Sequence, residues 1–196
     1  LYGTRSEEAF TKKATGLDVY IGTDRENWEG PKECFHAPVG FWATMNYWAP
    51  EVHEYRGNFY MFATFSDGKR KGTAILKADT PEGPFLPWSD GTITPKDWQC
   101  LDGTFYSAKD GTPYMVFCHE WKQVHDGTVC AVKLSEDLKN PEESPFVLFS
   151  ASAGRPKVQP LLFRNYVTDG PFLFRTEDGR LHMLWSSYGK GHSYIQ

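Results

Sequence analysis

Three stretches of the chain repeat one pattern, and this repetition constrains the fold more than any other feature. Each stretch has a run of β-prone residues, a turn with Gly beside Asp or Asn, and a second such run, which is typical of a β-hairpin. The stretches cover 50–65, 104–121 and 171–188, and apolar positions with a helical period are nearly absent. The sequence therefore predicts an all-β fold whose unit is a four-stranded antiparallel sheet, repeated about every 50 to 70 residues.

Sheets repeated at this period without helices between them favour a β-propeller. A sandwich or jelly roll is the alternative, because short strands alone are compatible with it. The internal register favours the propeller. Counting back nine residues from the hairpin glycine reaches Trp48 in the first stretch and Asp102 in the second, and counting back ten reaches Asp169 in the third. The glycines used for this count are Gly57, Gly111 and Gly179.

Asp102 and Asp169 thus hold equivalent positions, each at the start of the first strand of its sheet. In a propeller these strands run along the central channel, so their starts converge at one face although 67 positions (169 minus 102) separate the two residues. Two carboxylates that meet in a cleft change each other's ionisation, and such pairs perform acid–base chemistry. A solvated turn, the common setting of an Asp before Gly, gives no reason for this convergence.

Composition limits the classes of partner. Aromatic residues make up 16% of the chain, which favours strands and suits sugar binding, because the C–H faces of sugars lie well on flat apolar rings. The formal net charge is -4, whereas a protein that reads the nucleic-acid backbone has a basic face. No apolar run approaches the roughly 18 residues of a membrane span. We therefore predict a carbohydrate partner, and neither nucleic acid nor membrane.

Three segments resemble glycoside hydrolase family 43. They are FWATMNYWAPEV (41–52), LDGTFYSAKDGTPYMVF (101–117) and TDGPFLFRTEDGRLHMLW (168–185). The resemblance extends from residue 1 to about 190, and it implies a five-bladed β-propeller that cleaves glycosidic bonds with inversion. The chain is then expected to be a single propeller catalytic domain over 1–196, truncated at both ends and covering roughly blades 1 to 4.

The resemblance also implies three acidic residues at the rim, of which two match this chain. Asp102 matches the Asp that orients the general acid and tunes its ionisation. Asp169 matches the general acid itself, although the family has Glu there, so that the arm is one methylene shorter. The general base, an Asp on the first inner strand, is expected upstream of Leu1, and this chain alone is therefore expected to be inactive. Acid and base of an inverting enzyme stand roughly 6.5–9.5 Å apart on opposite faces of the sugar.

Several side chains near these positions are candidates for binding the sugar. We expect Trp48, at the position equivalent to the acids, and Trp42, in the loop before it, to form the floor or wall of a sugar subsite. His119, Glu120 and Trp121 follow the second strand of the sheet that carries the first acid, and we expect them in a loop near the pocket. Glu120 is the reserve candidate for the acid. A solvated loop or a salt bridge between blades is the alternative for these three residues.

No metal site is predicted from the residues present. His119 and His125 are six positions apart, whereas the H-E-x-x-H motif places its histidines four apart on one helical face. The resemblance requires no cofactor, but it implies a calcium-bound axial site whose histidine is expected beyond Gln196. Glu51, three positions after Trp48, is expected to accept hydrogen bonds within its sheet and to take no part in catalysis.

The predicted function is an inverting glycoside hydrolase that cleaves α-L-arabinofuranosyl or β-D-xylosyl linkages of plant cell-wall polysaccharides or oligosaccharides. The alternative is a catalytically silent carbohydrate-binding propeller. A protein-interaction propeller is disfavoured, because it has no use for acids at the rim of successive blades. The family resemblance further implies a secreted or periplasmic location. A ring that lacks part of its first blade and its last blade is expected to expose open sheet edges, which favour aggregation.

Overall fold

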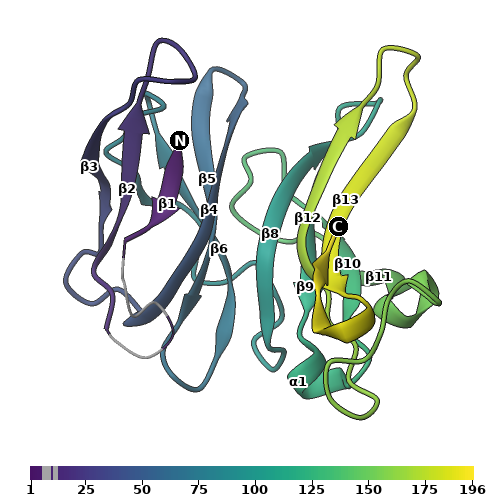
Figure 1. Cartoon of the computed structure of the whole chain (residues 1–196). Helices are drawn as coiled ribbons and strands as arrows, with labels where there is room; N and C mark the ends of the chain where they lie inside the picture. Colours follow the sequence, from purple (N-terminus) through teal and green to yellow (C-terminus); the bar gives the residue numbers. More distant parts are fainter. Residues whose placement is uncertain (6–9, 11–12) are drawn as a thin grey trace. The chain divides into compact units, whose positions relative to one another are not determined.

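The computed structural model describes residues 1–5, 10 and 13–196. The chain forms two compact units, unit 1 (Leu1–Lys96) and unit 2 (Asp97–Gln196), and each is described by itself (Figure 1). Among these described residues each unit contains two sheets, and the strand pairs that form them are antiparallel. No helix in the described part of the chain is long and apolar enough to cross a membrane.

Unit 1 has a three-stranded sheet, β1-β2-β3, and a four-stranded sheet, β4-β5-β6-β7. Neighbours in sequence are neighbours in each sheet, so the strands follow one another as a meander. The turn between β4 and β5 contains Gly57 with a φ of 75°, a left-handed conformation that glycine adopts without steric cost. The strands are β1 (Tyr2–Thr4), β2 (Gly16–Ile21), β3 (Glu29–His36), β4 (Met45–Tyr55), β5 (Asn58–Ser66), β6 (Lys71–Ala78) and β7 (Leu86–Pro87).

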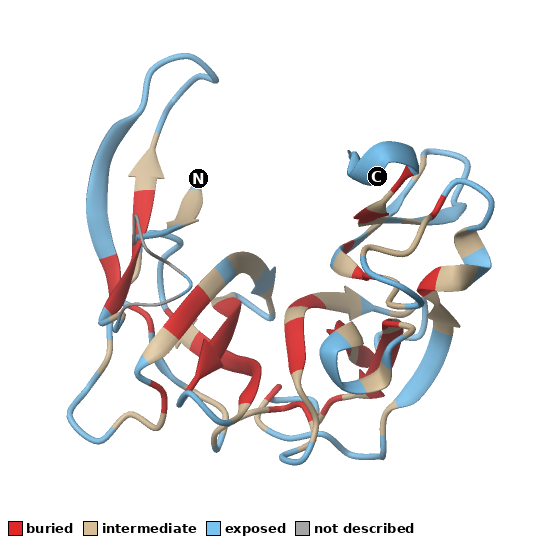
Figure 2. Cartoon of the chain, turned by 60° about the horizontal axis from the view of Figure 1, so that its bottom comes forward, coloured by how far each residue is buried: buried red, intermediate tan, exposed pale blue. Residues whose placement is uncertain are grey.

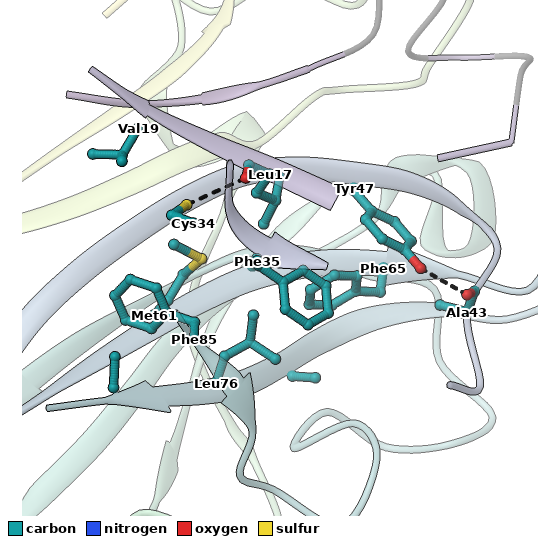
Figure 3. Packing of buried hydrophobic residues seen from close by; sticks show 13 residues of the cluster. Leu17, Val19, Cys34, Phe35, Ala43, Tyr47, Met61, Phe65, Leu76 and Phe85 are labelled. Atoms are coloured by element: carbon teal, nitrogen blue, oxygen red, sulfur yellow. Dashed lines mark hydrogen bonds between the residues drawn. The ribbon is translucent and has the colours of Figure 1, made fainter. Parts of the chain in front are cut away.

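The core of unit 1 joins its two sheets (Figure 3). Leu17 from β2 and Phe35 from β3 pack with Phe65 from β5, and all three are at most 1% exposed. The rings of Phe35 and Phe65 meet edge to face with centroids 5.9 Å apart. The hydroxyl of the buried Tyr47 donates a hydrogen bond to the carbonyl of Ala43 at 2.8 Å, so its polar end is satisfied.

Unit 2 has a four-stranded sheet, β8-β9-β10-β11, and a three-stranded sheet, β12-β13-β14. Within the unit, β12 lies beside β8 and β9. The strands are β8 (Cys100–Ser107), β9 (Pro113–His119), β10 (Thr128–Lys133), β11 (Phe146–Ser150), β12 (Asp169–Arg175), β13 (Leu181–Tyr188) and β14 (Tyr194–Ile195). The helical turns are α1 (Trp121–Val124), η1 (Ala151–Gly154) and η2 (Lys190–His192).

Burial is uneven within unit 2. Leu173 from β12 and Met183 from β13 pack against a buried cluster of β8–β10 that includes Leu101 and Val116. In both units the strands carry most of the buried residues, and most loop residues are exposed or half-buried (Figure 2). Large apolar side chains of β12 and β13 are nevertheless exposed, namely Phe172, Phe174, Leu181 and Leu184.

The prediction of an all-β fold built from antiparallel sheets is confirmed. The three predicted hairpins are β4–β5, β8–β9 and β12–β13. Each sheet is a meander without a crossover, which is the topology of a propeller blade, whereas sandwiches and jelly rolls use Greek-key connections. The helical turn α1 forms within the segment that was expected to be a loop.

Candidate functional site

Asp102 and Asp169 lie at β-bulges at the starts of two adjacent strands of unit 2. The ladder between β8 and β9 shifts register between Leu101 and Thr104, and the φ of Asp102 is 54°. The ladder between β12 and β13 shifts between Asp169 and Phe172. A bulge re-aims a side chain and is common beside active sites, and a non-glycine residue in the left-handed region is strained. Each acid thus lies at a β-bulge near the beginning of its strand.

A hydrogen bond connects the two strand starts. The backbone N–H of Gly170, the residue after Asp169, donates to Oδ2 of Asp102 at 3.0 Å, across 68 positions of sequence. Both aspartates are half-buried. The structure therefore brings together the two acids that the repeat pattern predicted to converge.

The charges of both acids reach one buried thiol. Cys118 of β9 is completely buried, and burial raises its pKa well above the usual range. The negative charges of Asp102 and Asp169 raise this pKa further, whereas a hydrogen bond with Thr168 lowers it. The thiol therefore stays neutral near the two carboxylates.

Tyr194 of β14 is a site residue that the sequence analysis missed. Its hydroxyl donates a hydrogen bond to Oδ2 of Asp169 at 2.9 Å. Burial raises the pKa of Tyr194, and the charge of Asp169 and this hydrogen bond raise it further. The contact depends on the pairing of β13 with β14, in which Tyr188 lies opposite Tyr194. The only sequence signal was a two-residue β-prone run near the end of the chain.

The side chain of His119 is buried and contacts a tryptophan ring and a glutamine amide. Its ring stacks on Trp98 with centroids 4.1 Å apart and planes 8° from parallel. Its Nε2 lies 2.8 Å from Oε1 of Gln123. The same amide accepts from the backbone N–H of Gln99 and donates to the carbonyl of Asp97, so this cluster fastens the chain before β8 to α1.

Glu120 and Trp121 lie at the same end of the β8–β11 sheet as Asp102. The strand ladder places His119, their neighbour in sequence, opposite Cys100. Glu120 is only 6% exposed, and its Oε1 lies 3.4 Å from Nζ of Lys122. The ammonium group of Lys122 also lies 5.8 Å from the centroid of the Trp121 ring. The salt bridge between Glu120 and Lys122 is formed within one segment.

Trp48 lies at the start of β4 in unit 1, between two register shifts of the β4–β5 ladder. Nζ of Lys71 stands 5.1 Å from the centroid of its ring, and the ring of Phe10 meets it edge-on at 5.1 Å. Nε2 of His53 lies 2.8 Å from Oε1 of Glu51. This contact lies within one strand, and the structural role expected of Glu51 stays a prediction.

Trp42 borders a cavity of about 460 Å³ in unit 1. The guanidinium of Arg70 lies over its ring at 4.8 Å, and Phe41 and Phe65 pack around it. The indole N–H is buried without a hydrogen-bond partner in the described part of the chain. Both tryptophans thus belong to unit 1, and the acids belong to unit 2.

Metal ligands do not gather among the described residues. These residues contain no group of three or more His, Cys, Asp or Glu side chains that could hold a metal ion. The calcium site implied by the resemblance, whose histidine is expected beyond Gln196, therefore stays a prediction.

Comparison with curated proteins identifies two extracellular relatives. The chain is 24% identical over 120 residues to the extracellular endo-alpha-(1->5)-L-arabinanase 1 of Bacillus subtilis, which covers 56% of this chain and 37% of that protein. It is 26% identical over 145 residues to the extracellular exo-alpha-(1->5)-L-arabinofuranosidase ArbA of Cellvibrio japonicus, which covers 65% of this chain and 40% of that protein. The chain thus spans less than half the length of either relative.

Solved structures support the same relationship. The endo-arabinase from Bacteroides thetaiotaomicron is 41% identical, with a TM-score of 0.87 over 92% of this chain and 65% of that chain. A thermostable family-43 glycoside hydrolase matches in fold, with a TM-score of 0.75 at 18% identity over 100% of this chain and 72% of its own. The four sheets therefore correspond to part of a β-propeller, and the sandwich alternative is excluded. The model of the glycosyl hydrolases family 43 matches residues 2–196, and the chain belongs to this family of glycosidases.

Proposed function

We propose that the protein hydrolyses α-L-arabinofuranosyl linkages of arabinan with inversion of configuration. Asp169 acts as the general acid, Asp102 keeps that acid protonated and oriented, and an Asp outside residues 1–196 acts as the general base. The solved relative at 41% identity is named an endo-arabinase, and the two curated relatives are named for α-(1->5)-L-arabinan chemistry. These names favour arabinosyl over xylosyl linkages.

The observation that carries the proposal is the hydrogen bond from the N–H of Gly170 to Oδ2 of Asp102. It holds the two carboxylates in one cluster, where the charge of Asp102 disfavours ionisation of Asp169. In the reaction, the proton of Asp169 passes to the glycosidic oxygen as the C–O bond breaks. The base removes a proton from the water that attacks the opposite face of the sugar.

The short arm of Asp169 fits this role because of the bulge at the start of β12. The bulge gives β12 one residue more than β13 between the paired positions, and Gly170 has a φ of 51°. A bulge displaces the backbone locally and redirects the side chain beside it. We infer that this displacement brings Asp169 to the glycosidic oxygen despite the missing methylene.

The experiment is hydrolysis of linear α-1,5-arabinan, an aryl arabinofuranoside and an aryl xyloside by the natural protein that contains this chain. We expect faster turnover of the arabinosides. Asp169→Asn is expected to lower turnover of arabinan about 10²- to 10⁴-fold, which is the usual contribution of a general acid. Asp178→Asn is the matched control, because Asp178 caps the turn between β12 and β13 through Thr176 and Arg180.

Three outcomes would contradict the proposal. Binding of arabinan without hydrolysis indicates the silent carbohydrate-binding propeller. Equal activity of Asp169→Asn and the unaltered protein removes Asp169 from the acid role, and Glu120→Gln then tests the reserve candidate. Faster turnover of the xyloside assigns the enzyme to xylosyl linkages.

We also propose that the protein acts outside the cytoplasm, because both curated relatives are named extracellular. Cell fractionation with an antibody against this chain tests this location. Signal confined to the cytosolic fraction would contradict it.

A further inference from the structure

Tyr194 contacts the proposed acid from the third strand of the β12–β14 sheet. Its hydroxyl donates to Oδ2 of Asp169 at 2.9 Å, and its ring meets that of Tyr188 edge to face with centroids 5.3 Å apart.

The hydroxyl of Tyr194 is held as a donor toward Asp169. Burial is the main cause that raises the pKa of Tyr194, followed by the charge of Asp169 and the hydrogen bond to it. A hydrogen bond with Ser186 acts in the opposite direction and lowers this pKa, as expected of a donor to the phenol oxygen. Ser186 lies opposite Asp169 in the β12–β13 ladder. The observed hydrogen bond directs the proton of the tyrosine to the carboxylate.

This arrangement distinguishes the two oxygens of Asp169. Oδ2 already accepts a hydrogen bond from Tyr194, so the acidic proton belongs on Oδ1. When the O–H bond at Oδ1 breaks, the proton goes to the glycosidic oxygen and the bonding electron pair stays on the carboxylate. A hydrogen bond to a charged acceptor is about twice as strong as one to a neutral acceptor. The contact with Tyr194 therefore strengthens as the transition state develops.

We propose that Tyr194 is a positioning residue that selects Oδ1 of Asp169 as the proton donor and stabilises the carboxylate formed when the proton leaves. This inference rests on the proposed function, because it requires Asp169 to be the general acid. Stabilisation of the Asp169 carboxylate by Tyr194 is needed only when the leaving group requires protonation. Natural arabinosyl linkages require it, whereas a 4-nitrophenolate departs with little help from an acid.

The test compares Tyr194→Phe on α-1,5-arabinobiose and on 4-nitrophenyl α-L-arabinofuranoside, using the natural protein that contains this chain. We expect kcat on the disaccharide to fall about 10- to 100-fold, the loss typical of a hydrogen bond to a charged group, with KM unchanged. We expect less than about a threefold change on the nitrophenyl substrate. Tyr188→Phe is the matched control: it removes a neighbouring hydroxyl, keeps the ring contact and is expected to leave both substrates unaffected.

A loss of equal size on both substrates, or no loss on the disaccharide, would overturn the role of Tyr194. Ser186→Ala is the second variant if Tyr194→Phe does not fold, and it is expected to show the same leaving-group dependence at smaller size. Asp169→Asn separates the two proposals. If Asp169→Asn shows strong leaving-group dependence and Tyr194→Phe does not, only the inference about Tyr194 fails. If Asp169→Asn has no effect, the proposed function fails first.

Discussion

A β-bulge occurs at the start of β4 in unit 1 and at the starts of β8 and β12 in unit 2. The side chains at these three bulges differ. All three ladders shift register there, at Trp48, Asp102 and Asp169. The ring of Trp48 lies under the ammonium group of Lys71, whereas Asp102 accepts a backbone N–H. The bulge therefore sets where the side chain points, whereas the residue type decides between an aromatic ring and an acid.

The largest expected effect concerns the charge at the start of β8. Asp102→Asn keeps an oxygen that can accept the N–H of Gly170 but removes the charge that favours protonated Asp169. We expect turnover of arabinan to fall about 10²-fold. Without the repulsion, Asp169 loses its proton at lower pH, so the alkaline limb of the pH–rate profile moves to lower pH. Measurement of kcat/KM across pH checks both effects.

Asp110→Asn is the control for this substitution. Asp110 lies in the turn between β8 and β9, where its carboxylate accepts the backbone N–H of Thr112 at 3.0 Å. It is expected to leave turnover and the alkaline limb unchanged. An unchanged alkaline limb in Asp102→Asn would show that its charge does not act on the acid.

Gly170, the residue after Asp169, has a left-handed backbone conformation. A Cβ on Gly170 meets no atom within 4 Å, but the φ of 51° is unfavourable for any side chain. Gly170→Ala is expected to lower the free energy of unfolding by about 1–2 kcal/mol, measured by urea denaturation. Gly3→Ala is the control, because Gly3 has equal space and no positive φ. Equal stability of the two variants would contradict strain at this bulge.

A smaller effect is expected at the aromatic start of β4. If Trp48 contacts the sugar, Trp48→Ala raises KM for arabinan about 3- to 10-fold and leaves kcat unchanged, because a stacking contact contributes roughly 0.5–1.5 kcal/mol. Trp28→Ala is the control, since Trp28 is 45% exposed in the loop between β2 and β3. An unchanged KM would make Trp48 a packing residue between Lys71 and Phe10.

The smallest expected effect is a gain of stability. Ala49 follows Trp48 with a φ of 45° and is exposed. Ala49→Gly relieves left-handed strain but adds freedom to the unfolded chain, and the balance favours the folded state by about 0.5 kcal/mol. Chemical denaturation measures this change. A loss of stability would show that the bulge of β4 does not carry the strain assigned to it.

The fold and the pairing of the acids could be predicted from the sequence because both depend on short-range patterns. Gly57, Gly111 and Gly179 all have positive φ and close the three predicted hairpins. The first strand of each hairpin has a similar length. The residue nine or ten positions before the hairpin glycine therefore lies at the same end of each sheet. The general base, the calcium site and the extent of the catalytic domain stay predictions.

Other features of the site could not be predicted because they depend on tertiary contacts. Tyr194 reaches Asp169 only through the pairing of a two-residue strand. His119 was expected near the pocket, but its packing on Trp98 comes from a residue 21 positions earlier (119 minus 98) that no pattern connects to it. The sequence likewise gave no sign that Lys71 would occupy one side of Trp48.

The bond between Gly170 and Asp102 also determines which changes of length the chain can accept during evolution. The spacing of the acids is fixed by the alignment of two backbones, because a main-chain N–H serves as the donor. Side chains in a strand alternate between faces, so a single-residue insertion within β12 would turn Asp169 away and break this bond. The turns at 108–112 and 176–180 can gain or lose residues without moving either acid. We therefore expect length variation among homologues to fall in these turns and to avoid the short stretch from Asp169 to Phe172.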